Sequence, residues 1–126
     1  MVELPVRDEP RSFPFVPAPA LNRWGYDMVT VSYRLTVHGD PVGFEQVLQS
    51  ITAYLRGQPG FLGHRVYRSQ GRPEVYVAAA DWVDDEAHRR AARSAGFLSR
   101  IRSMVGLARA EPEVLDLVAT EAAVAR

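Results

Sequence analysis

The segment "YLRGQPGFLGHRVYRS", residues 54–69, decides the fold because an amphipathic helix changes into a strand within a few residues. Apolar residues repeat at helical spacing up to Leu55, and Gly57 is a natural residue to follow the last turn of a helix. Pro59 cannot continue the helix, and a strand is predicted from Phe61 onward. The segment therefore predicts that the chain turns back sharply through a Pro-Gly corner.

Regular periodicities lie on both sides of this corner. The segment "MVTVSYRLTVH" alternates apolar and polar residues, which predicts a half-buried strand. Asp40 followed by Pro41 is typical of a helix start, and "QGRP" is typical of a hairpin turn. The elements predicted in this part of the chain are a strand at 28–38, a helix at 41–56 and paired strands at 61–69 and 74–82.

The last part of the chain predicts one long second helix and a fourth strand. Asp84 or Asp85 in "VDDEAHRR" can cap the helix, and acidic residues occupy its first turn. We expect Glu111 and Pro112 to end the following connection and "EVLDLVAT" to form the strand. The predicted buried stripe of the helix consists of Ala87, Ala91, Ala95, Leu98, Ile101 and Val105.

The β-α-β-β-α-β order predicts a ferredoxin-like α+β fold. Right-handed crossovers place both helices on one face of a four-stranded antiparallel sheet. The other face would be bare in a monomer, and a second copy of the chain is the simplest cover. A formal net charge of zero gives weak protection against such self-association. We therefore expect a homodimer that forms a dimeric α+β barrel.

The first 26 residues differ from the rest of the chain. Prolines cluster in residues 5–19 without any periodicity, which predicts an extended segment. Its apolar side chains favour an arm that lies along a surface of its own subunit or of a neighbour, and a disordered tail is the alternative. The sequence thus divides into a Pro-rich N-terminal arm (1–26) and one domain (27–126).

Composition excludes several classes of site and partner. The chain has no cysteine, which excludes disulfides, thiolate metal sites and a cysteine nucleophile. It has no lysine, which excludes Schiff-base chemistry and pyridoxal phosphate attachment. Zero net charge gives no basic field for nucleic acid. No apolar run reaches the roughly 18 residues of a membrane span, and the N-terminus lacks a signal-peptide pattern, so we expect a cytoplasmic protein without membrane contact.

Four short segments carry a family resemblance. They are the corner "QPGFLGHRVYRS", the strand "YVAAADW", the helix start "DDEA" and "SAGF" further along. Together they resemble the antibiotic biosynthesis monooxygenase family, whose members are small dimeric α+β barrels, over residues 28–119. The resemblance leaves the N-terminal arm unexplained. It identifies the superfamily better than a function, because this fold supports several chemistries.

The resemblance implies a cofactor-free oxygenase for phenolic or anthrone substrates. In such members the substrate loses a proton and its electron-rich anion reduces O2 directly, assisted by an Asn four residues before a Trp and a Tyr six residues after it. Here Trp82 matches the Trp, but Ala78 and His88 stand at the other two positions. The haem-degrading branch matches less well, because its axial His would fall near Ile101 and its first-strand Asn near Tyr33.

One strand face predicts the shape of a binding pocket. Strand alternation places Tyr76, Ala78, Ala80 and Trp82 on the same face. Two alanines between two aromatic residues leave a gap that fits a flat aromatic ligand, or else lets a helix pack closely. Tyr33 lies among apolar residues on one face of the first strand. If it is buried, its hydroxyl needs a hydrogen-bond partner, either another side chain or a ligand.

The three histidines are the candidate bases, since their unperturbed pKa lies near neutrality. His88 follows the matched Trp and is the first candidate, with a solvated helix residue as the alternative. His64 is the second, with a hydrogen-bonded sheet histidine as the alternative, and His38 is expected to be exposed. Arg93 could hold a phenolate or carboxylate, or simply lie on the surface. The histidine spacing matches no metal-binding motif, so no metal is expected.

Three further residues are candidate substrate contacts. Tyr67 is expected to share a strand face with Arg65 and Phe61 and could face either a pocket or the dimer partner. If the N-terminal arm folds over a pocket mouth, Asn22 could supply the amide that position 78 lacks, and Trp24 could form a lid.

Three functions remain open from the sequence. The leading hypothesis is a cofactor-independent monooxygenase that uses O2 on a small aromatic polyketide or related phenol. The second is a polyketide cyclase or aromatase, in which the same base would enolise a β-polyketone. The third is a non-catalytic dimer that binds a small molecule, which the absence of the family's Asn at Ala78 keeps open.

Overall fold

Seven elements follow one another in the computed structural model, which describes residues 27–124. Strands and helices follow the predicted order, except that the second helical region is divided into two helices. The elements are β1 (Val29–Val37), α1 (Pro41–Arg56), β2 (Phe61–Arg68), β3 (Val75–Trp82), α2 (Asp85–Ala92), α3 (Ala95–Met104) and β4 (Ala108–Asp116).

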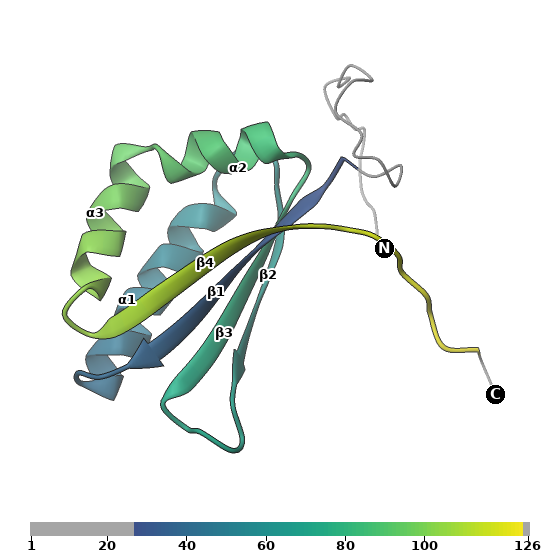
Figure 1. Cartoon of the computed structure of the whole chain (residues 1–126). Helices are drawn as coiled ribbons and strands as arrows, with labels where there is room; N and C mark the ends of the chain where they lie inside the picture. Colours follow the sequence, from purple (N-terminus) through teal and green to yellow (C-terminus); the bar gives the residue numbers. More distant parts are fainter. Residues whose placement is uncertain (1–26, 125–126) are drawn as a thin grey trace.

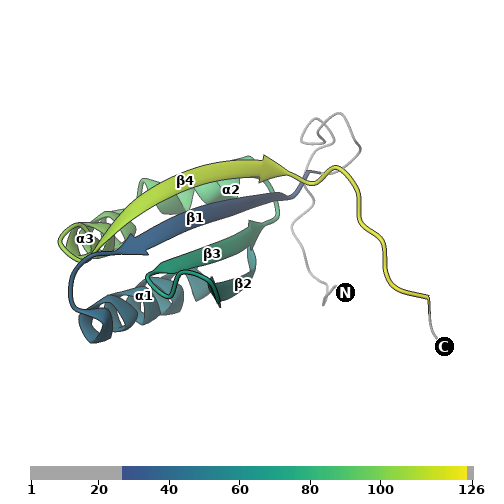
Figure 2. The same cartoon turned by 60° about the horizontal axis from the view of Figure 1, so that its bottom comes forward.

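The four strands form one antiparallel sheet in the order β2-β3-β1-β4. The helices cover one face of this sheet, and no element among residues 27–124 covers the other face (Figures 1 and 2). This arrangement confirms the predicted ferredoxin-like α+β fold. Among the strands, the central β1 and β3 carry nearly all of the buried side chains, so the core lies between them and the helices.

The start of α1 and the Pro-Gly corner behave as the sequence predicts. The carboxylate of Asp40 accepts hydrogen bonds from two backbone N–H groups of the first helical turn. After the helix ends beside Gly57, Gly60 adopts a φ of +87°, which favours glycine. Its carbonyl accepts a hydrogen bond from the N–H of Val83 at 2.9 Å. A Cβ placed on Gly60 would lie 2.5 Å from the Cβ of Ala87, so the corner packs tightly against the junction of β3 and α2.

The prediction of one long second helix is wrong, because α2 and α3 meet at Arg93 and Ser94. Asp84 caps α2, and Oγ of Ser94 accepts a hydrogen bond from the backbone N–H of Phe97 at 3.2 Å, which caps a new helix. The break rotates the inward side of the second helical region, and Phe97 becomes buried. Of the predicted stripe, Ala87 and Ala91 are buried and Ile101 is partly buried, whereas Ala95, Leu98 and Val105 are exposed.

An irregularity near the start of β2 changes which side chains face the helices. Phe61 pairs with Trp82, but the next pairs along the strand are Gly63 with Asp81 and His64 with Ala80. Leu62 is therefore an extra residue of the kind found in a β-bulge. Directly opposed residues share a sheet face, so His64 lies on the helix-facing side with Ala80.

The fourth strand begins earlier than predicted. β4 starts at Ala108 and includes Glu111 and Pro112, so the prediction that these two residues end the connection is wrong. Pro112 pairs with Tyr33 across the β1–β4 ladder. β4 is an edge strand, and proline is tolerated there because the N–H groups on its outer side need no strand partner.

Large aromatic side chains fill the core between sheet and helices. Phe44, Trp82 and Val31 are the largest fully buried side chains. The ring centroid of Phe44 lies 4.8 Å from that of Tyr76, and this contact joins α1 to β3.

Within residues 27–124, no helix has the length and apolar character needed to cross a lipid bilayer.

Candidate active site

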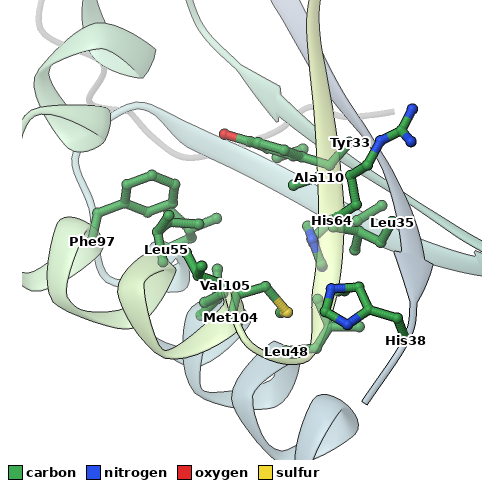
Figure 3. Close-up of a pocket in the computed structure, with 16 residues that line it drawn as sticks. Tyr33, Leu35, His38, Leu48, Leu55, His64, Phe97, Met104, Val105 and Ala110 are labelled. Atoms are coloured by element: carbon green, nitrogen blue, oxygen red, sulfur yellow. The ribbon is translucent and has the colours of Figure 1, made fainter. Parts of the chain in front are cut away.

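A cavity of about 530 Å³ lies between the helix-facing side of the sheet and the helices α1 and α3. Figure 3 shows Phe97 and Leu55 on one side of this cavity and His38 on the opposite side, with His64 between them. A volume of this size and apolar lining suits a small organic ligand. The apolar side chains of the helices that line it are Leu48, Ile51, Leu55, Phe97, Ile101 and Met104.

The two alanines of β3 line the cavity, which fits the ligand gap, one of the two interpretations that the sequence left open. Ala78 and Ala80 are buried, and both line the cavity wall. Tyr33 lies directly opposite Ala78 in the β1–β3 ladder and lines the same space. Small side chains on one strand therefore leave room for a ligand beside the phenol ring on the next.

The hydroxyl of Tyr33 is available to a ligand. No other group in residues 27–124 forms a hydrogen bond with it, although the ring packs against the core. Burial raises the pKa of Tyr33, so the phenol stays protonated at neutral pH. It is therefore a hydrogen-bond donor in a largely apolar space.

His64 is the histidine that the strand irregularity brings into the cavity. Its side chain is half-buried, and its Nδ1 lies 3.4 Å from Oγ1 of Thr52 on α1. Burial lowers the pKa of His64, and the carboxylate of Asp81 opposes this effect in part. The imidazole is therefore neutral at neutral pH and has an unprotonated nitrogen that can accept a proton.

His88 and Trp82 lie behind the cavity and do not line it. The ring of Trp82 is only 1% exposed and lies 5.5 Å from Phe61 and 6.1 Å from His88. Nδ1 of His88 is buried without a hydrogen-bond partner in the described part of the chain, and the nearest carboxylate oxygen, from Asp85, is 3.7 Å away. Both residues border a small void of about 10 Å³ that shares four wall residues with the cavity: Tyr33, Leu55, Ala80 and Phe97.

An outer groove lies on the other side of His64. It has a volume of about 570 Å³ and runs between α1 and the edge strand β2. His64 and Leu48 line both the groove and the cavity, whereas Thr52 lines the groove alone. Tyr76 also faces the groove, where its hydroxyl donates a hydrogen bond to the carboxylate of Glu45 at 2.9 Å.

Several candidate residues lie away from the cavity. Tyr67 is 55% exposed and pairs with Val77 on the face of the sheet that the helices leave bare. The prediction that Tyr67 shares a face with Phe61 is therefore wrong, because Leu62 interrupts the alternation between them. Arg93 is exposed at the end of α2. Asn22 and Trp24 fall outside the described residues.

Two polar residues of the cavity lining were not singled out as candidate ligand contacts from the sequence. His38 is exposed, as expected, but its side chain borders the cavity (Figure 3). Arg109 on β4 also belongs to the lining, although its position between Ala108 and Ala110 directs its guanidinium, which pairs with Glu111, toward the bare face of the sheet. The sequence held no signal for Arg109, since position 109 was expected to precede the strand.

Comparisons with known proteins agree with this geometry. The profile of the antibiotic biosynthesis monooxygenase family matches residues 28–103, which is more than half of the chain. Deoxynogalonate monooxygenase from Streptomyces nogalater is 39% identical over 85 residues, covering 68% of this chain and 72% of that protein.

Solved structures give the same result. The crystal structure of SnoaB, a cofactor-independent oxygenase from Streptomyces nogalater, superposes with a TM-score of 0.72 at 36% identity, covering 75% of this chain and 96% of SnoaB. Rv0793 from Mycobacterium tuberculosis shares the fold, with a TM-score of 0.68 at 16% identity over 76% of this chain and all of that one. Deoxynogalonate monooxygenase and SnoaB confirm the resemblance drawn from the sequence and the expected monooxygenase activity, whereas Rv0793 supports the fold alone. The chain belongs to the antibiotic biosynthesis monooxygenase family.

Proposed function

We propose that this monooxygenase oxidises a flat, acidic aromatic molecule of the anthrone or phenol type, such as an aromatic polyketide, with O2 inside the cavity. The observation that carries the proposal is an apolar cavity with a neutral imidazole, His64, and a protonated phenol, Tyr33, in its lining. The similar deoxynogalonate monooxygenase and SnoaB support the same class of chemistry.

His64 is the general base in this proposal. A base is most effective when its pKa lies near or below the working pH, because it is then unprotonated and still able to accept a proton. Burial keeps the His64 imidazole in that state. His88, the first candidate from the sequence, has no side-chain atom in the cavity lining, so its predicted role as base depends on a path through the wall formed by Tyr33 and Phe97.

Tyr33 stabilises the anion that deprotonation creates. When a proton leaves the substrate carbon, negative charge moves onto the neighbouring carbonyl or phenol oxygen. A hydrogen bond from a phenol is stronger to that anion than to the neutral substrate, so it lowers the barrier. The surrounding apolar side chains strengthen this interaction because they exclude water.

The reaction balances without a further oxidant. His64 takes one proton from a CH2 group, and the resulting carbanion gives electrons to O2 and bonds to it, which forms a peroxide. The proton returns from His64 to the peroxide, the O–O bond breaks, and the second C–H proton leaves as the C=O bond forms. The net change is CH2 plus O2 to C=O plus H2O.

The bare face of the sheet is the proposed dimer interface. It carries outward residues from all four strands and no covering element in the described chain (Figure 2). Tyr67 and Leu115 contribute exposed apolar area there. Sedimentation analysis of the wild type and of Tyr67→Arg tests this proposal, because a buried arginine at that place would weaken the dimer.

A cytoplasmic location remains a prediction from the sequence.

Oxygen uptake with anthrone or a dihydroxynaphthalene tests the proposed activity. The chelator-treated protein should consume O2 above the rate of the spontaneous reaction. His64→Gln should lower kcat by about 100-fold, the usual contribution of a general base, and Tyr33→Phe should lower it as well. His88→Gln is the matched comparison, since it changes the other candidate base. A loss in His88→Gln alone would move the base to that residue.

Two further outcomes would contradict the proposed activity. Product formation without O2 consumption would indicate cyclisation or aromatisation. Tight binding of the aromatic molecule without any turnover would indicate a binding protein, and the alanine at position 78 in place of the family's Asn would be the first residue to restore.

A further inference from the structure

We propose that Thr52 is a positioning residue that fixes the tautomer of His64, with the proton on Nδ1 and the lone pair on Nε2. Thr52 lies in the fourth turn of α1, and its Oγ1 is 3.4 Å from Nδ1 of His64. The link between this tautomer and turnover rests on the proposed role of His64 as base.

The direction of this hydrogen bond follows from the second contact of Thr52. A threonine hydroxyl has a single hydrogen, and Oγ1 of Thr52 donates it to the carbonyl of Leu48, 3.0 Å away. The same oxygen can therefore only accept from His64. Because a neutral imidazole has one N–H and one bare nitrogen, Nδ1 must be the donor and Nε2 the acceptor.

The location of the two residues gives this tautomer its consequence. Thr52 lines the outer groove and does not line the cavity, whereas His64 borders both. Nδ1 is occupied on the groove side, which leaves Nε2 as the nitrogen available to a ligand in the cavity. The opposite tautomer would present an N–H to the substrate and could not remove a proton.

Nothing else in the described chain competes for Nδ1. The ring of His64 makes no second hydrogen bond within residues 27–124, and Asp81, whose charge affects its pKa, bonds to Thr30 and lies near Arg65. Other titratable or charged groups line the same two spaces without contacting His64: Tyr33, His38 and Arg109 in the cavity, and Glu45, Arg56 and Tyr76 in the groove.

The hydrogen bond to His64 is long, and it needs to supply little free energy. The two neutral tautomers of an imidazole differ little in free energy, so a weak acceptor at one nitrogen is enough to select between them. Thr52 is also a poor choice for helix stability, since a β-branched residue in the middle of a helix loses side-chain freedom.

The tautomer can be measured directly by NMR on the whole chain labelled with 15N-histidine. His64→Gln identifies the His64 signals by their absence. Above the pKa of His64, the wild type should show a protonated, pyrrole-type Nδ1 and an unprotonated, pyridine-type Nε2. Thr52→Val, which keeps the β-branched shape but has no acceptor, should gain the Nε2–H form, and Thr52→Ser should retain the wild-type pattern.

Kinetics on the same variants connect the tautomer to turnover. Thr52→Val should lower kcat by about tenfold with little change in KM, since a fraction of the general-base contribution is lost while the cavity is unaltered. Thr52→Ser should keep the kcat of the wild type. If the methyl group of Thr52 had a purely structural role, this variant would lose activity as well.

The NMR spectra test the role of Thr52, and the kinetics of His64→Gln test the proposed base. A wild-type spectrum with the proton on Nε2, or a Thr52→Val spectrum identical to the wild type, would overturn the role of Thr52. If the spectra follow the expectation but His64→Gln keeps full turnover, the tautomer stands and the proposed base is wrong.

Discussion

The hydroxyl of Tyr54 donates a hydrogen bond to Oγ of Ser94 at 2.7 Å, and this contact joins α1 to the point where α2 ends and α3 begins. Ser94 in turn donates to the carbonyl of Ala91 at 2.7 Å and caps α3. All hydrogen-bonding positions of this serine are therefore used at the helix break. The break directs Phe97 into the cavity, so Tyr54 helps to shape a ligand site that it does not line.

Gly96→Ala should destabilise the protein because Tyr54 occupies the space that a Cβ needs. A Cβ at this position would lie 2.6 Å from Cζ and 2.7 Å from the hydroxyl oxygen of Tyr54. Overpacking of this kind costs about 1–3 kcal/mol, which exceeds the gain of up to about 1 kcal/mol from replacing glycine in a helix. We expect a lower midpoint in urea unfolding.

Gly71→Ala is the control for this substitution. A Cβ on Gly71 meets nothing within 4 Å, so its unfolding midpoint should stay close to that of the wild type. Equal midpoints for Gly96→Ala and Gly71→Ala would mean that the Tyr54 ring moves aside at little cost.

Gly60→Ala should be more harmful than Gly96→Ala, since two effects add. A positive φ costs a residue with a Cβ about 1–2 kcal/mol, and the overlap with Ala87 adds a packing cost of about 1–3 kcal/mol. The double variant Gly60→Ala/Ala87→Gly removes the overlap and keeps the strained φ. Calorimetry should therefore show that the double variant is more stable than the sum of the two single changes; strict additivity would exclude the contact.

Ala78→Leu should lower activity while leaving the fold intact. The leucine side chain would extend into the cavity, where space exists, so the free energy of unfolding should be unchanged or higher. A substrate would lose that space, and kcat/KM should fall by about tenfold or more, which corresponds to about 1.4 kcal/mol.

Ala87→Leu provides the opposite case for the same change of side chain. Ala87 borders the Pro-Gly corner and not the cavity, so its enlargement should lower stability by about 1–3 kcal/mol. If Ala78→Leu were as unstable as Ala87→Leu, the space beside Ala78 would not be a preformed cavity.

The pH dependence of stability should report His64. Its folded pKa is lowered by burial, and its unfolded pKa is about 6.5. Between these two values the unfolded chain binds more protons than the folded one, so the free energy of unfolding decreases as the pH falls from about 6.5 through the folded pKa. His64→Gln should show a smaller decrease over this window in urea titrations, and parallel curves for the two proteins would contradict the lowered pKa.

Activity should change over the same pH range and in the same direction. Protonation removes the lone pair of His64, so kcat/KM should fall as the pH drops through its folded pKa. Stopped assays at each pH, corrected for the spontaneous oxidation of anthrone, measure this limb. A flat profile above the acid unfolding range would exclude His64 as the base.

Periodicity predicted the main elements because each has one buried side. The alternation of β1 and the helical spacing of α1 gave nearly the observed bounds, and the alanines of β3 indicated either a ligand gap or close helix packing, of which the structure has the gap. The helix break at Ser94 was missed, since no proline marks it, Gly96 was taken as a residue inside one long helix, and a serine cap is a weak signal inside an apolar pattern. Pro112 was misread as a breaker because the sequence does not show which strand lies at the edge.

The chemistry of the site was harder to predict than its shape. His88 was preferred over His64 because it follows the matched Trp82, whereas its ring packs against that tryptophan behind the wall. His64 would face outward in a strand of unbroken alternation starting at Phe61. Gly63 was the one local hint of an irregularity, since glycine inside a strand often accompanies a bulge.

The extra residue in β2 means that the side chains which this strand presents to the cavity depend on its register as well as on its composition. If Leu62 occupied a regular position in the ladder, alternation from Phe61 would turn Arg65 and Tyr67 inward and His64 outward, and the cavity would exchange an imidazole for a guanidinium and a phenol. Straightening of the bulge with Leu62 retained would therefore replace the histidine in the cavity lining by an arginine and a tyrosine without any substitution. Engineering of this scaffold for new substrates can therefore vary the register of β2 in addition to its residues.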